Sequence, residues 1–111
     1  MKTFAEFYPY YLQEHSTRGC RALHYVGTTG VIALALTAII LGEFGLVSGI
    51  PVVGYGFAWI GHFGVEKNRP ATFKHPLWSL RADFVMYFEW LSGRLGKSLQ
   101  AAGVSVSTPR R

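Results

Sequence analysis

Residues 22–42 read ALHYVGTTGVIALALTAIILG, and residues 44–65 read FGLVSGIPVVGYGFAWIGHFGV. Neither stretch contains Asp, Glu, Lys or Arg, and only Glu43 stands between them. A helix needs about 20 predominantly apolar residues to cross the hydrocarbon core of a membrane. Glycines and Pro51 early in the second stretch predict a turn, so its helix should run from about Ile50 to Val65. The two stretches together predict a hairpin of two transmembrane helices.

Length and composition agree with this prediction. The chain has 111 residues, of which 50% are hydrophobic and 15% charged, against about 25% charged in an ordinary soluble domain. The alternative is a buried hairpin inside a soluble protein, but the remaining residues are too few to cover two uncharged helices. We therefore expect an all-α, small integral membrane protein, with amphipathic or re-entrant helices flanking the central hairpin.

Two amphipathic segments flank the hairpin. Residues 1–15 are rich in aromatic side chains and contain Pro9, which predicts a kinked helix that lies at the membrane interface or packs as an ordinary helix. A second helix should begin at Pro76, and whether residues 76–92 span, re-enter or lie on the membrane stays open. Its apolar stripe consists of Leu77, Leu80, Phe84, Phe88 and Leu91. We expect one catalytic domain over residues 1–92 and a flexible basic tail over residues 93–111.

The distribution of charge predicts the orientation of the hairpin. The net charge is +5, but the basic residues are dispersed and no nucleic-acid-binding motif is present, so we expect no nucleic acid as a partner. All eleven lysines and arginines lie outside residues 22–66, whereas the turn of the hairpin carries only Glu43. Basic residues are retained on the cytoplasmic side of a membrane. Both termini should therefore be cytoplasmic.

The chain contains four histidines, His15, His24, His62 and His75. The first two flank the start of the first span, and the last two flank the end of the second. Because a hairpin returns to the side from which it started, all four should lie at the cytoplasmic surface. His15 and His24 are nine residues apart and would face about 180° apart on one continuous helix. They can meet only if the helix breaks between them, and residues 16–19 are a suitable place.

This placement suggests a metal site. Imidazole is a common ligand of iron, zinc, copper and nickel. Four imidazoles, or three with a carboxylate from Glu66 or Asp83, could hold a divalent ion, and Glu14 is a further candidate as a ligand or as the acceptor that orients an imidazole. The alternative is that the histidines are interfacial anchors or packing residues. Spacing alone does not choose the metal.

Other polar and small residues give weaker signals. Cys20 is the single cysteine, so an intramolecular disulfide and a CxxC metal site are excluded. Arg69 and Arg81 could bind a carboxylate, because the arginine fork matches its two oxygens. Small residues allow membrane helices to approach closely, and such glycines are also compatible with a homodimer. The glycines in question are Gly54, Gly56, Gly61 and Gly64.

Three segments resemble a known family: HSTRGCRALHYVGTT, GYGFAWIGHFGVEKNRPATF and HPLWSLRADFVMY. They are similar to the Mpo1-like family, whose best-known member is the yeast endoplasmic-reticulum 2-hydroxy fatty acid dioxygenase. The shared pattern is His-x4-Asn-x3-His-x2-Gly, then Gly-His-x3-Glu and a downstream His-Pro. The resemblance covers about residues 5–92. Cys20 stands where the pattern has asparagine, a change associated with bacterial members.

The resemblance implies an oxidoreductase of fatty acid alpha-oxidation. Such an enzyme uses Fe2+ and O2, without 2-oxoglutarate, to convert a 2-hydroxy fatty acid into the acid that is one carbon shorter. His15, His24, His62 and His75 carry over as iron ligands, and Glu66 as a motif residue without a defined role. Arg69 or Arg81 would then steady the carboxylate of the substrate. The implied location is a bacterial inner membrane, with the site in contact with membrane lipid.

Two other functions are compatible with the residues. The chain could be a non-catalytic membrane protein that binds a metal or lipid, or that serves as a scaffold. It could also form an oligomeric pore, although the spans contain few polar residues. Bound metal and oxygen-dependent turnover of a 2-hydroxy acid would separate these functions.

Overall fold

The computed structural model describes residues 1–104, and within them it contains helices and turns but no strand. The predicted all-helical fold is therefore confirmed. The elements in chain order are α1 (Phe4–Gln13), α2 (Arg18–Leu41), the 3₁₀ segment η1 (Phe44–Gly49), α3 (Ile50–Trp59), the π-helix η2 (Ile60–Glu66), the 3₁₀ turn η3 (Ala71–Phe73), α4 (Pro76–Leu91) and α5 (Leu95–Ala101).

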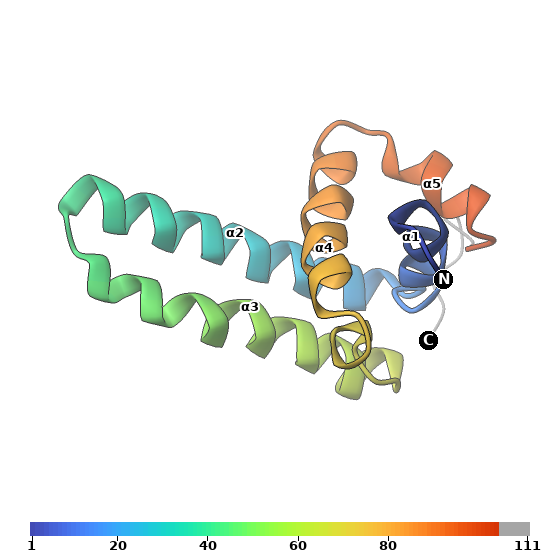
Figure 1. Cartoon of the computed structure of the whole chain (residues 1–111), viewed down its shortest axis with the longest axis horizontal. Helices are drawn as coiled ribbons and strands as arrows, with labels where there is room; N and C mark the ends of the chain where they lie inside the picture. Colours follow the sequence, from blue (N-terminus) through green and yellow to red (C-terminus); the bar gives the residue numbers. More distant parts are fainter. Residues whose placement is uncertain (105–111) are drawn as a thin grey trace.

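Helices α2 and α3 form the long hairpin, and α4 runs across it (Figure 1). At 24 residues α2 is about 36 Å long, more than the ~30 Å of a hydrocarbon core. It ends at Gly42, whose φ of +68° is the left-handed conformation that glycine adopts most easily. The second helix begins at Ile50 as predicted and continues through η2 to Glu66.

Glycines allow α2 and α3 to touch. A Cβ atom at Gly30 would lie 2.7 Å from Cγ1 of Val53, and one at Gly61 would lie 3.1 Å from Sγ of Cys20. Either distance is too short for an ordinary contact. The backbones of α2 and α3 can therefore lie this close only because Gly30 and Gly61 have no side chain. These glycines thus close the hairpin itself, and a homodimer through the remaining ones stays a prediction.

The outer faces of the hairpin are apolar and exposed. Ile40 on α2 is 77% exposed and Val52 on α3 is 73% exposed. Residues 18–41 and 44–66 are both long and apolar enough to cross a membrane, and few of their side chains are buried within the protein. A soluble protein would bury such helices, so their exposure favours the lipid environment that the sequence predicts.

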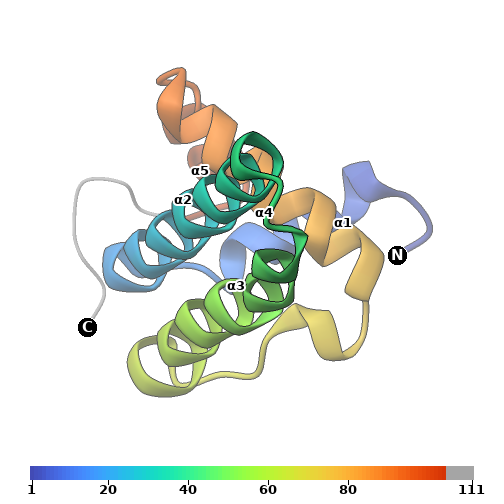
Figure 2. The ribbon, with the colours of Figure 1, turned by 90° about the vertical axis from the view of Figure 1, so that its left-hand side faces the viewer.

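At the base of the hairpin, α1, α4 and α5 surround the main apolar core (Figure 2). The buried side of α4 carries small and medium residues, among them Ala82 and Met86. The predicted stripe of α4 faces the other way, with Leu77 79% exposed. That stripe is therefore not the core face of α4, although exposure of this kind suits contact with lipid.

The expected flexible tail differs from the structure over residues 95–104. Gly93 at φ +77° turns the chain back, and α5 then packs Leu95 and Leu99 into the core together with Val104. The sequence window is rich in glycine and serine, but these two leucines are four residues apart and form the buried face of one short helix. The remaining part of the predicted tail, residues 105–111, lies outside the described residues.

Candidate metal centre

Three of the four histidines meet at the base of the hairpin. His15 lies in the turn between α1 and α2, His24 on the second turn of α2, and His62 on η2. Nε2 of His15 is 3.1 Å from Nε2 of His24 and 3.0 Å from Nε2 of His62. The three rings are close to mutually perpendicular, with interplanar angles of 78°, 81° and 87°. Each ring is at most 6% exposed, so the cluster is closed to solvent.

A break between the first two helices brings His15 and His24 together, as predicted. Helix α1 ends at Gln13, and α2 begins only at Arg18. Thr17 caps the new helix, because its hydroxyl accepts a hydrogen bond from the backbone N–H of Cys20. The four residues between the helices redirect the chain, so that two histidines nine positions apart face one another.

Hydrogen bonds fix the tautomers of His15 and His24. Nδ1 of His15 lies 2.6 Å from the carbonyl oxygen of Tyr11, and Nδ1 of His24 lies 2.8 Å from that of Cys20. A carbonyl oxygen can only accept, so each Nδ1 carries the proton and donates it. In each neutral ring Nε2 is then left as a lone pair that faces the cluster.

His62 is oriented by a side chain instead. Its Nδ1 lies 2.7 Å from Oδ1 of Asn68, and Nδ2 of Asn68 donates to the carbonyl of Glu14 at 3.1 Å. The second bond fixes which end of the amide faces the histidine, because only the nitrogen can donate to Glu14. Asn68 therefore presents an oxygen to His62, whose Nε2 also becomes a lone pair. The left-handed Lys67, at φ +63°, turns the chain so that Asn68 can reach back.

Three lone pairs thus point at one another without a proton between them. Burial, followed by the neighbouring His24 and His62, holds the pKa of His15 well below its usual value, so the ring is neutral at pH 7. Such an arrangement is repulsive unless a cation lies between the nitrogens. Two nitrogens that are each about 2.1 Å from an ion lie about 3.0 Å apart when their bonds to it are at right angles. The two spacings from His15 therefore match those of neighbouring ligands on one ion, and all three nitrogens belong to a group whose ligand atoms lie within 4.8 Å of one another.

Cys20 is the fourth buried residue of this group, whose potential ligand atoms all lie within 4.8 Å of one another. Its Sγ lies 3.9 Å from Nδ1 of His24, the nitrogen on the far side of that ring from the other histidines. Its sulfur also fills the space that a side chain at Gly61 would need. The geometry therefore makes Cys20 a packing residue of the hairpin beside the three nitrogen donors.

Glu66 holds the turn that carries His15. Its carboxylate accepts hydrogen bonds from the backbone N–H of Ser16 and of Thr17, at 3.1 and 3.0 Å, and from both of their hydroxyl groups. The carboxylate thus ties the end of η2 to the start of α2, where the helix dipole favours a negative charge. Since both carboxylate oxygens are engaged there, the geometry supports a positioning role for Glu66 rather than ligation.

The structure does not bring His75 to the other three histidines. Its ring lies at the N-terminus of α4, stacked on Trp78 and in edge contact with Phe7. His75 does not belong to the buried group that could hold a metal in the described part of the chain. Its role as an iron ligand stays a prediction that this geometry does not support.

The remaining candidate residues lie around the cluster. Arg69 and Arg81 each place the guanidinium over an aromatic ring, Phe73 and Phe4 respectively, and neither lines the histidine cluster. Asp83 does line it, and its carboxylate accepts a hydrogen bond from the hydroxyl of Tyr11.

The environments of the two acidic candidates differ. Burial raises the pKa of Asp83 to about 7, and the Tyr11 hydrogen bond opposes that rise. Glu14 contributes its backbone carbonyl to the Asn68 bond, while its carboxyl group is half-buried. Glu14 thus supports the cluster through its main chain and not as the predicted side-chain acceptor.

Sequence reasoning missed two residues of the cluster. From the sequence Asn68 is a candidate, with Arg69, for binding an anionic head group and not a partner of a histidine, and Tyr11 is only part of an aromatic helix. In the structure Asn68 orients His62, and the ring of Tyr11 stacks on His15 with centroids 4.0 Å apart. Tyr11 is four residues before His15, a helical spacing that could have indicated this contact.

Fold and site together define a class of protein: a small all-helical chain with two apolar helices of membrane-spanning length and a buried histidine cluster able to hold a metal. Residues 1–95 match the family described as 2-hydroxy-palmitic acid dioxygenase Mpo1-like, and the chain belongs to this family. No curated protein and no solved structure matches it. The family resemblance predicted from the sequence is thus confirmed.

Proposed function

We propose that this protein is an iron(II)-dependent dioxygenase that shortens a 2-hydroxy fatty acid by one carbon, using O2 and no 2-oxoglutarate. The observation that carries the proposal is the convergence of three deprotonated Nε2 atoms in a buried cluster. The family description supports the reaction, because it names a 2-hydroxy-palmitic acid dioxygenase. Imidazole nitrogens suit iron(II) among other divalent metals.

His15, His24 and His62 would hold the iron. Three protein ligands would leave room on the iron for other ligands, and the carboxylate and hydroxyl oxygens of a 2-hydroxy acid are suitable donors. Bound iron would supply the redox chemistry by which O2 reacts beside the C1–C2 bond. The protein keeps the three nitrogens unprotonated through the acceptors on Nδ1, and it excludes water by burying the rings.

We also propose that the hairpin spans a bacterial inner membrane, with both termini and the histidine cluster on the cytoplasmic side. The lysines and arginines of the chain all lie outside residues 22–66, and the turn of the hairpin carries Glu43 alone. The cluster lies at the end of the hairpin opposite that turn, where an acyl chain in the membrane would present its carboxyl group.

Activity of the purified protein tests this function. The iron-loaded protein in detergent is incubated with 2-hydroxyhexadecanoic acid under air and under nitrogen. We expect pentadecanoic acid under air only, and no product from His62→Ala, whereas His75→Ala tests the histidine that lies outside the cluster. An iron-loaded wild-type protein that forms no product under air would contradict the proposal. It would favour the alternative of a non-catalytic membrane protein that binds a metal or lipid.

A further inference from the structure

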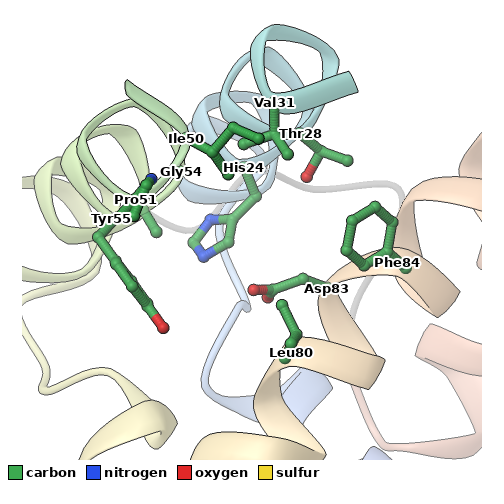
Figure 3. Close-up of a pocket in the computed structure, with 11 residues that line it drawn as sticks. His24, Thr28, Val31, Ile50, Pro51, Gly54, Tyr55, Leu80, Asp83 and Phe84 are labelled. Carbon is green, nitrogen blue, oxygen red and sulfur yellow. The ribbon is translucent and has the colours of Figure 1, made fainter. Parts of the chain in front are cut away.

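A cavity of about 200 Å³ lies between α2, α3 and α4 (Figure 3). We name it the acyl cavity. Its wall is mostly apolar, with Val31 from α2, Ile50 and Pro51 from the start of α3, and Leu80 and Phe84 from α4. His24 and Asp83, the imidazole and the carboxylate of its lining, approach each other in the close-up.

The acyl cavity adjoins the histidine cluster. His24, Tyr55, Ala58 and Asp83 line both the cavity and the narrow space between the three histidines. The Nε2 atom of His24 thus faces the other two histidines, while the same ring also lines the acyl cavity. A molecule whose polar end meets the three nitrogens would have this cavity as the adjoining space for its apolar part.

The acyl cavity extends from His24 and Asp83 toward the turn of the hairpin. Along α2 its lining runs from His24 to Val31, which is about two helical turns or 10 Å. On α3 it reaches Ile50, the first residue of that helix after the hairpin turn. The apolar end therefore points into the membrane-spanning part of the hairpin, in the direction that the tail of a membrane lipid takes.

The two ends differ chemically in a way that a 2-hydroxy fatty acid matches. The carboxylate of Asp83 accepts a hydrogen bond from the Tyr11 hydroxyl and lines the polar end of the cavity. A second hydroxyl group, from a ligand, could also donate to this carboxylate. The apolar walls can bury methylene groups, each of which strengthens binding by a factor of about four. A molecule with a hydroxyl at its head and a long hydrocarbon chain satisfies both ends.

We propose that the acyl cavity binds the carboxyl-proximal part of the acyl chain of a 2-hydroxy fatty acid, with the hydroxyl group at Asp83 and the chain passing Gly54 toward Val31 and Ile50. The inference rests on the proposed function for the identity of the ligand. Pockets that enclose a whole small ligand measure about 300–1,000 Å³, so a cavity of about 200 Å³ holds the first part of the chain. The rest of the chain lies along the hairpin among lipid tails.

Gly54 and Val31 are close neighbours in the wall of the cavity. A Cβ atom at Gly54 would lie 3.3 Å from Cγ2 of Val31. Val31 and residue 54 therefore face each other across the lining, and added volume at either position would narrow the path of the chain. This makes Val31 the residue whose enlargement most directly shortens the space available.

Photo-crosslinking locates the chain without requiring turnover. The iron-loaded protein in detergent is mixed under nitrogen with 2-hydroxyhexadecanoic acid that carries a diazirine either near its carboxyl group or at its methyl end. We expect the first probe to label residues 28–31, 50–54 and 80–84, and the second to label the outer faces of the hairpin. Labelling by the first probe on outward residues such as Val52, with none in the acyl cavity, would overturn the inference.

Two variants and one control sharpen the result. Val31→Phe removes room for about two methylenes and should weaken competition by unlabelled 2-hydroxyhexadecanoic acid by about fifteenfold. Val26→Phe is the matched control, because Val26 lies on the same helix, is 52% exposed and does not line the cavity. Phe84→Trp fills the cavity from α4 and repeats the test if Val31→Phe does not fold. If unlabelled 2-hydroxyhexadecanoic acid competed equally well in Val31→Phe, Phe84→Trp and the control Val26→Phe, the inference would be overturned.

The outcome is separable from that of the proposed function. Labelling of the acyl cavity in a protein that forms no pentadecanoic acid under air would contradict the dioxygenase and retain the acyl site. Formation of pentadecanoic acid with the first probe outside the cavity would retain the dioxygenase and overturn the acyl site.

Discussion

At the scale of single residues, the orientation of each histidine depends on the hydrogen-bond acceptor at its Nδ1. For His15 and His24 the acceptor is a backbone carbonyl of the preceding helical turn. For His62 it is Asn68, held in turn by the carbonyl of Glu14. A substitution cannot remove a backbone carbonyl, but it can remove the side chain of Asn68. Replacing Asn68 therefore tests directly whether the acceptor orients the histidine.

Asn68→Ala should lower the affinity for iron about 10–100-fold, because His62 loses the acceptor that fixes its tautomer. The measurement is a titration of the metal-free protein with Fe2+ under nitrogen. Gln13→Ala is the matched control: this amide also donates a side-chain hydrogen bond to the backbone, at 3.0 Å, but to Ala102 after α5 and not to a residue that orients a histidine. Equal affinities of Asn68→Ala and wild type would mean that Asn68 does not orient a ligand.

Glu66→Gln should destabilise the protein by about 1–3 kcal/mol, because an amide cannot accept from all the donors of Ser16 and Thr17 at once. The midpoint of thermal unfolding in detergent should fall. Glu43→Gln, an exposed change at the hairpin turn, should leave it unchanged. A fall of the same size in both variants would contradict the special role assigned to Glu66.

The sequence allowed the meeting of His15, His24 and His62 to be predicted, because topology alone places them at one end of the hairpin. It did not allow the acceptors at Nδ1 to be predicted, since these depend on side-chain rotamers and on the left-handed turn at Lys67. His75 shows the limit of the topological argument. His75 lies at the same end of the hairpin as the other histidines but does not join their cluster. The loop after Glu66 places the ring of His75 against Trp78 instead.

At the scale of elements, the close contact of α2 with the helix formed by α3 and η2 positions His24 and His62. Gly61 immediately precedes His62 and touches the backbone of Cys20, where an added Cβ would lie 3.3 Å from the carbonyl oxygen. The π-helical turn at this point widens the helix, and such turns occur frequently at functional sites. The apolar pattern predicts the helix here but not its π-helical form.

Gly61→Ala should separate the two helices and cost about 1–3 kcal/mol of stability, because the added Cβ would meet the buried Sγ of Cys20 and the backbone of the same residue. The same variant should bind less iron. Gly56→Ala on α3 is the control, since nothing lies within 4 Å of its Cβ position and alanine favours the helix. Unfolding midpoints and iron content in detergent check both expectations, and equal behaviour of the two variants would contradict them.

The sequence predicted neither the existence of helix α5 nor the buried face of α4. The start of α4 at Pro76 follows from the sequence, whereas its buried residues, Ser79, Ala82, Met86 and Tyr87, are of mixed size and polarity. The stripe of large apolar residues therefore marks the outward face, which suits an interfacial helix. The core contact of α5 depends on Leu95 and Leu99, which local composition alone does not distinguish from a loop.

At the scale of the whole molecule, the hairpin should place its turn on the side of the membrane opposite the histidine cluster. In a Cys20→Ala background, Glu43→Cys should react with a membrane-impermeant maleimide in intact cells. Lys97→Cys, on the exposed side of α5, should react only after the membrane is permeabilised. Reaction of Lys97→Cys alone in intact cells would reverse the proposed orientation.

We propose that three imidazole nitrogens, and no sulfur, hold one iron ion at the base of the hairpin. X-ray absorption at the iron edge of the iron-loaded protein measures these ligands. We expect nitrogen or oxygen neighbours at about 2.1 Å, with outer-shell scattering from three imidazole rings. A sulfur neighbour at about 2.3 Å, or a spectrum without imidazole scattering, would contradict this assignment.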